Sequence, residues 1–222
     1  MKRLPQLIAA IAAVTLPCAP LVAAPIPGLF PTGVSGAGNL LSAGSADPHY
    51  TLVASADPSS PGPVARVVNE GFPIGPWMAN GPTSKWIAPM ASQSTGSAAG
   101  NYTYRLSFDL GGLQPATAAI TGQWSSDNAG TSVLLNGVPT GNSTSGNFGT
   151  FVPFSISSGF VSGINTLDFV VNNAGDTANP TGLRVELSGT AEIEPPPGTP
   201  PSIQSAPDDV TVLIGGSAAF RV

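Results

Sequence analysis

The sequence predicts an all-β protein, a jelly-roll β-sandwich, and three observations favour this class. Charged residues make up only 9% of the 222 residues, whereas the chain holds 27 glycines and 24 prolines. Segments rich in Val, Ile, Thr and Phe alternate with short turn signals, a balance typical of strands rather than helices. The hydrophobic share of 41% is enough for a core and argues against a disordered chain.

About eight or nine strands are expected, separated by turns that contain Gly, Pro, Asn or Asp. Residues 102–110 carry the clearest pattern, because Tyr102, Tyr104 and Leu106 alternate with polar residues and so share one face. No segment has the period of a helix. The expected strands are residues 50–53, 64–68, 86–87, 102–110, 118–124, 132–135, 151–156, 165–172 and 183–191.

Residues 118–138 are predicted to form the central hairpin of the sandwich. A strand that ends at Trp124 is followed by a polar turn over residues 125–130 and by a second strand, residues 132–135. Trp124 shares its face with Ile120 and is expected in the core. Asn136-Gly137 predicts a type I′ turn, since both residues tolerate a positive φ.

Composition excludes several classes of function. The net charge is −5 and no basic cluster exists, so neither nucleic acid nor an anionic membrane surface is an expected partner. The single cysteine, Cys18, lies in the predicted leader, which leaves no disulfide, thiolate metal site or Cys nucleophile afterwards. His49 is the only histidine, and no G-x-S-x-G segment accompanies it. We therefore predict no catalytic residue, no metal site with Cys and His ligands, no cofactor and no enzymatic activity.

An ordered set of short motifs runs through residues 102–191. The motifs are Trp124-Ser125-Ser126-Asp127-Asn128, Val133-Leu134-Leu135-Asn136-Gly137, Gly163-Ile164-Asn165-Thr166-Leu167, Phe169-Val170-Val171-Asn172 and Gly182-Leu183-Arg184-Val185, with Ser84-Lys85-Trp86-Ile87 upstream. In this order they resemble the galactose-binding-like jelly rolls of bacterial exported proteins and of accessory modules in glycoside-active enzymes. The resemblance implies that sugars or other ligands bind in loops at one end of the sandwich.

A second set of motifs occupies residues 201–222. It reads Pro-x-Ile, Asp-Val-Thr-Val, Gly-Gly-Ser-Ala and Phe-x-Val, and it resembles the start of an immunoglobulin-like domain. About twenty residues cannot bury a core of their own. The resemblance therefore implies that the chain is a fragment followed by further immunoglobulin-like domains, which commonly act as spacers or adhesive units.

Four regions are predicted along the chain. The first has Lys2 and Arg3, then a short apolar run over residues 7–16, which is the pattern of a secretory signal peptide and too short for a membrane helix. No later stretch is apolar and long enough to span a membrane. The regions are 1–24, the signal peptide; 25–193, the galactose-binding-like sandwich; 194–201, a Pro-rich linker; and 202–222, the partial immunoglobulin-like domain.

Polar loop residues are the candidate ligand-binding groups. Asp127 and Asn128 offer carboxylate and amide oxygens, which suit sugar hydroxyls or a structural Ca²⁺. Alternatively, the two side chains bond to nearby backbone and shape a turn. Asn172 and Asn173 are candidates of the same kind, at an end of the sandwich that the sequence does not specify.

Carboxylates and tryptophans leave further alternatives. Asp127 and Glu186 could take part in a carboxylate pair for glycoside hydrolysis, whereas Asp109 and Asp168 lie on the strand faces opposite their apolar neighbours and are expected to face solvent.

Trp77 lies in a Pro- and Gly-rich loop, where an exposed indole could stack on a sugar ring. Equally, it could cap one end of the sandwich against Pro73 and Pro76, and Trp86 is expected in the core.

These observations predict a non-catalytic β-sandwich module that is exported by a bacterium and is secreted or held at the cell surface. Its partners would be glycans or components of the cell surface or matrix. Two other hypotheses stay open: an accessory domain of a carbohydrate-active enzyme, with the catalytic part beyond residue 222, and a structural unit that binds no ligand.

Overall fold

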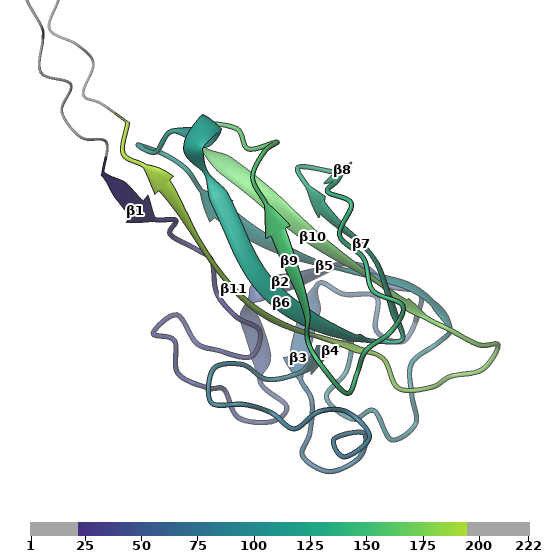
Figure 1. Cartoon of the computed structure of the whole chain (residues 1–222). Helices are drawn as coiled ribbons and strands as arrows, with labels where there is room; N and C mark the ends of the chain where they lie inside the picture. The colour runs from purple at the N-terminus through teal and green to yellow at the C-terminus, as the bar shows by residue number, and fades with distance from the viewer. Residues whose placement is uncertain (1–21, 195–222) are drawn as a thin grey trace, which may run out of the picture.

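Antiparallel strands form nearly all the regular structure of residues 22–194, the part of the chain that this computed structural model describes (Figure 1). The one helical element in this range is the short 3-10 turn η1 (Pro115–Thr117). The all-β prediction is confirmed. The strands are β1 (Ala23–Pro25), β2 (Ala46–Ala54), β3 (Val64–Val67), β4 (Ile87–Ala88), β5 (Gly100–Asp109), β6 (Ala119–Asp127), β7 (Ala129–Leu135), β8 (Val138–Pro139), β9 (Val152–Ile156), β10 (Ile164–Asn173) and β11 (Gly182–Glu192).

The strands follow one hydrogen-bonded order, β8-β7-β10-β5-β2-β3-β4-β11-β6-β9, and β1 pairs with β11. This sheet curls so that β7, β10 and β5 lie behind β6, β9 and β11 in Figure 1. The short strands β3 and β4 join the two halves. The result is a β-sandwich of jelly-roll type, in which each half buries one face against the other.

Aromatic side chains fill the space between the two halves. Tyr102, Tyr104, Leu106 and Phe108 of β5 are all buried, as their alternation predicts. Trp124 of β6 is fully buried, and its ring centroid lies 5.6 Å from that of Phe169 on β10. Burial of each such side chain is worth about 1.5–3 kcal/mol, so this core dominates stability. The prediction that Trp124 belongs to the core is confirmed.

The predicted central hairpin is wrong. β6 pairs with β11 and β9, whereas β7 pairs with β10 and β8, so the chain crosses from one half of the sandwich to the other at Asn128. The polar turn expected over residues 125–130 is absent, because β6 continues to Asp127 and β7 starts at Ala129. The polar residues Ser125, Ser126 and Asp127 suggested a turn in the sequence, but all three are buried and belong to β6.

The Asn-Gly turn is confirmed one connection later. Asn136 and Gly137 have φ angles of 52° and 80°, and both are positive as a type I′ turn requires. They join β7 to β8, with Leu135 opposite Val138. A tight turn of this type follows the right-handed twist of the two strands.

Both ends of the described region lie on neighbouring strands. In β1, Ala23 pairs with Glu192 and Ala24 with Ala191 of β11, so the last two residues of the predicted signal peptide belong to this strand pair. The rest of that peptide, nearly all of the Pro-rich linker and the immunoglobulin-like segment lie outside the described residues. Within residues 22–194, no helix has the length and apolar character needed to cross a bilayer.

Candidate functional site

Trp77 is buried rather than displayed. Its side chain is 2% exposed, and its ring centroid lies 4.4 Å from that of Trp86. The indole Nε1 donates a hydrogen bond of 2.7 Å to Oδ2 of Asp127, and the backbone N–H donates to the carbonyl of Pro73. The exposed-indole interpretation is therefore wrong for this structure. Trp77 instead caps the sandwich, together with Trp86, whose predicted burial is confirmed.

Asp127 holds the end of β6 in place. Its backbone carbonyl accepts a hydrogen bond from the hydroxyl of Thr181, and its residue partner across the β6–β11 pair is Gly182. Burial raises the pKa of the carboxyl to about 6, although the hydrogen bond from Trp77 lowers it in part. Its second oxygen, Oδ1, has no hydrogen-bond partner among the described residues. The peptide bond to Asn128 is cis.

Asn128 and Asn172 meet where β6 passes into β7. The backbone N–H of Asn128 donates to the carbonyl of Asn172, and Oδ1 of Asn128 accepts from the backbone N–H of Ala174. Asn172 donates from its own amide to Oδ1 of Asn101. The side chain of Asn128 is therefore bonded 46 residues away in the sequence, and that of Asp127 is bonded to Trp77, 50 residues away. The local turn-shaping interpretation is wrong for these two side chains.

Asn173 is 1% exposed and holds a neighbouring loop. Its amide nitrogen donates to the carbonyls of Ser97, Ala98 and Asn179 at 2.9, 3.2 and 3.1 Å. The register of β10 on β7 places it beside the β6–β7 crossing, so the four polar candidates gather at one end of the sandwich. Every one of them makes internal hydrogen bonds there. Their binding of a ligand stays a prediction.

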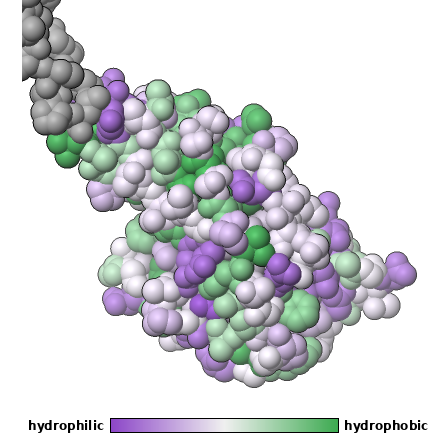
Figure 2. All heavy atoms as spheres, viewed as in Figure 1, coloured by the Kyte–Doolittle hydropathy of each residue, from purple (hydrophilic) through white to green (hydrophobic). Residues whose placement is uncertain are grey.

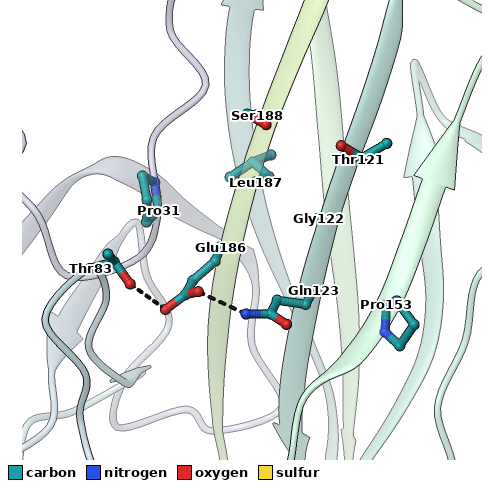
Figure 3. Close-up of a pocket in the computed structure, with 9 residues that line it drawn as sticks. All are labelled: Pro31, Thr83, Thr121, Gly122, Gln123, Pro153, Glu186, Leu187 and Ser188. Carbon is teal, nitrogen blue, oxygen red and sulfur yellow. Dashed lines mark hydrogen bonds between the residues drawn. The ribbon is translucent and has the colours of Figure 1, made fainter.

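A hollow lies elsewhere, on the outer face of β11, β6 and β9 (Figure 3). We call it the β11–β6–β9 groove, and its volume is about 510 Å³. Glu186 of β11 pairs directly with Gln123 of β6, which in turn pairs with Pro153 of β9. These three residues form one row across the strands. The lining consists of Pro31, Thr83, Thr121, Gly122, Gln123, Pro153, Glu186, Leu187 and Ser188.

The carboxylate of Glu186 is held by three side chains. Its Oε1 accepts hydrogen bonds from Thr83 and Ser84 at 2.6 and 2.7 Å, and its Oε2 accepts from Nε2 of Gln123 at 2.8 Å. Figure 3 shows the bonds from Thr83 and Gln123 converging on it from opposite sides. Burial alone would raise the pKa of Glu186, but these bonds and the charge of Arg184 outweigh it and lower the pKa. The side chain is therefore ionised at neutral pH and remains 23% exposed.

Arg184 supports this carboxylate from below the surface. Its side chain is only 3% exposed, and its Nη2 lies 3.5 Å from Oε1 of Glu186. It also donates from Nε to Ser84 at 2.7 Å and from Nη1 to the carbonyl of Ala79, and its guanidinium lies over the ring of Phe151. Residues 79–84 are thereby fastened to β11, and Thr83 of this segment lines the groove.

Sequence reasoning named Glu186 only as one of several carboxylates and did not find the groove. The sequence signal for this site was the spacing of Arg184 and Glu186, which lie two residues apart and so share one face of a strand otherwise rich in apolar residues.

The expectation that Asp168 faces solvent is wrong. Asp168 is 5% exposed and accepts two hydrogen bonds of 2.7 Å from Arg105. Asp109 is exposed as expected.

The lining of the groove combines polar and apolar residues. It holds one carboxylate, one amide and three hydroxyl-bearing side chains, beside the apolar Pro31, Pro153 and Leu187. Glycoside hydrolysis in most families needs two carboxyl groups facing each other, and only one lines this hollow. In the described part of the chain, no three or more His, Cys, Asp or Glu residues are grouped to hold a metal ion.

Comparison with protein-family models, with curated proteins and with solved structures finds no match to this chain. The resemblances to galactose-binding-like and immunoglobulin-like domains therefore stay predictions from the motifs.

Proposed function

We propose that this chain is a non-catalytic, exported binding module that holds carbohydrate in the β11–β6–β9 groove, in a secreted or cell-surface protein. The observation that carries the proposal is the Glu186–Gln123 pair, a hydrogen-bonded carboxylate and amide set side by side on the outer face of the sheet. Sugar binding needs polar groups fixed in position beside an apolar surface. The side chains of Pro31 and Pro153 in the lining supply that surface.

Preorganisation supports this proposal further. Glu186 is bound by Thr83, Ser84, Gln123 and Arg184, so its position is set before a ligand arrives. A ligand then loses less free energy in ordering the site. Figure 2 shows that the visible face mixes polar and pale surface with separate apolar spots, and no continuous apolar patch covers it. Such a face fits a polar ligand better than an apolar one.

A glycan array with two matched variants tests the proposal. Ser188→Tyr places a ring in the groove, whereas Thr190→Tyr places the same ring two residues further along β11, outside the lining. We expect the chain to bind at least one glycan, Ser188→Tyr to weaken that binding by about tenfold or more, and Thr190→Tyr to leave it unchanged.

Thermal unfolding of both variants checks that each keeps the fold. If no glycan binds, or if Ser188→Tyr binds as the unchanged chain does, the groove is not a carbohydrate site. Equal losses in the two variants would likewise contradict it, because Thr190 does not line the groove.

A further inference from the structure

The polar atoms at the centre of the β11–β6–β9 groove are chiefly hydrogen-bond acceptors. Oε2 of Glu186 takes one hydrogen bond, from Gln123, and a carboxylate oxygen can accept two. Gln123 uses one of its two amide hydrogens in that bond, and its carbonyl oxygen is left as an acceptor, with no partner found in residues 22–194. The hydroxyl hydrogen of Thr83 is also spent on Glu186. At the centre one donor is left, the second amide hydrogen of Gln123, beside the acceptor oxygens of Glu186, Gln123 and Thr83, so a ligand that supplies donors fits best.

No positive charge compensates Glu186 on the groove side. The lining contains neither Lys nor Arg. Arg184 is the cation of the network, but its side chain is 3% exposed and it directs nitrogens to Ser84, Ala79 and Glu186 beneath the surface. An incoming group therefore meets a carboxylate before it meets the guanidinium. The chain as a whole is also acidic, with a net charge of −5.

These two features sort sugars by charge. A neutral sugar offers adjacent hydroxyl groups, each of which can donate to an acceptor. A sugar that bears a carboxylate or sulfate places hydrogen-bond acceptors against the acceptor oxygens of Glu186 and Gln123. It also brings a negative charge close to the carboxylate of Glu186. At 4 Å and the effective dielectric of a protein surface, that repulsion is far larger than one lost hydrogen bond. Thr121 and Ser188 border the same space and can serve the ring oxygens of a neutral sugar as donors.

We infer that the β11–β6–β9 groove takes neutral sugars, whose neighbouring hydroxyls donate to Glu186 and Gln123, and excludes sugars that carry acid groups. This inference rests on the proposed function and adds the class of ligand. Glu186 and Gln123 are the selecting residues, and Arg184 is a positioning residue that holds Glu186.

Three forms of one ligand test the inference. They are the neutral oligosaccharide with the strongest array signal, the same oligosaccharide oxidised at C6 to uronic acids, and the methyl ester of that product. Isothermal titration of the full chain should show the acidic form binding at least about tenfold more weakly than the neutral one. Esterification removes the charge but keeps the added carboxyl atoms, and we expect it to restore most of the affinity.

Two variants locate the effect. Glu186→Gln keeps the size of the side chain, and the preference for the neutral form should shrink to about threefold or less. Ser188→Asp leaves the hydrogen-bonded Glu186–Gln123 pair in place, adds a second carboxylate to the lining of the groove, and should enlarge the preference. The second variant decides the matter if the first does not fold.

The outcomes separate the inference from the proposed function. If the acidic form binds as well as the neutral form, or if only acidic glycans bind on the array, the inference is overturned while groove binding stands. If the ester stays as weak as the acid, size and not charge is responsible, and the inference is again overturned. If nothing binds, or Ser188→Tyr has no effect, the proposed function fails and the inference fails with it.

Discussion

The indole nitrogen of Trp77 lies 2.7 Å from Oδ2 of Asp127, and this hydrogen bond ties the loop before β4 to the last residue of β6. Both partners are buried, and the second carboxylate oxygen has no partner among the described residues. Loss of the donor would leave a buried carboxylate still less satisfied. The pair is therefore a point where a small chemical change has a measurable effect on stability.

Trp77→Phe tests this pair directly. Phenylalanine keeps most of the aromatic contact with Trp86 but removes the N–H donor, so we expect the free energy of unfolding to fall by about 1–3 kcal/mol. Urea unfolding measures the change. The same substitution in an Asp127→Asn background should cost less, since no charge is then stranded. Equal costs in both backgrounds would mean that the charge of Asp127 does not strengthen the hydrogen bond, since the amide oxygen of asparagine can still accept it.

Asp127 gives stability a dependence on pH. Burial raises its pKa to about 6 from an ordinary value of 3.8, so between these values the folded state binds more protons than the unfolded state. The stabilisation is complete below about pH 3.8 and is lost as the pH rises through 6. Relative to Asp127→Asn, the unchanged chain should therefore gain stability on acidification from pH 7 to 4.

Unfolding midpoints of the two proteins across this range measure that gain. Subtracting one series from the other removes carboxylates that both proteins share, including Asp47, whose pKa burial also raises. Parallel curves would show that Asp127 does not titrate in this window. Asp109→Asn, which changes an exposed carboxylate, should leave the difference in place.

Arg184→Ala should destabilise the chain and loosen residues 79–84. The change removes a buried cation with three hydrogen-bonding or ionic partners and leaves Glu186 partly buried without its counter-charge. We expect a loss of about 2 kcal/mol or more in the free energy of unfolding. Arg66 is exposed, and Arg66→Ala should stay within about 0.5 kcal/mol of the unchanged chain. Similar losses in both variants would contradict this role for Arg184.

Gly130 is a site of close packing in the core. A Cβ there would lie 2.3 Å from the Trp124 ring and 2.6 Å from the methyl of Thr144. Gly130→Ala should therefore cost about 1–3 kcal/mol through overpacking, seen as a lower thermal midpoint. Gly149 has no neighbour within 4 Å of its Cβ position, so Gly149→Ala provides the control and should have little effect. A tolerated alanine at residue 130 would mean that Trp124 can move aside.

Local pattern was enough to predict nine of the eleven strands, all except β1 and β8. In residues 102–110 every second side chain is apolar, and a strand turns alternate side chains to opposite faces, so the pattern itself encodes which face is buried. The Asn136-Gly137 turn is encoded in the same local way, because few other pairs accept two positive φ angles. Fold class followed from these repeated local signals.

Strand pairing depends on contacts between distant residues. Residues 125–127 look like a turn by composition, yet Asp127 pairs with Gly182 and Trp124 packs on Phe169, so β6 continues through them. A one-dimensional pattern does not specify which strand a given strand joins, because backbone hydrogen bonds are the same in every pairing. The crossing between the halves of the sandwich therefore appears only in three dimensions.

For the candidate site as well, some features follow from the sequence and others only from the fold. The sequence pointed to Asp127 and Asn128 because both side chains are polar. Their roles, however, depend on burial and on hydrogen bonds to Trp77 and Ala174, which lie 50 and 46 residues away in the sequence. The β11–β6–β9 groove joins Thr83, Gln123 and Glu186 from three separate segments. The chain alone predicted most of the extended segments and the tight turn at Asn136-Gly137. Only folding established which polar groups face one another, since the partner that satisfies each is distant along the chain.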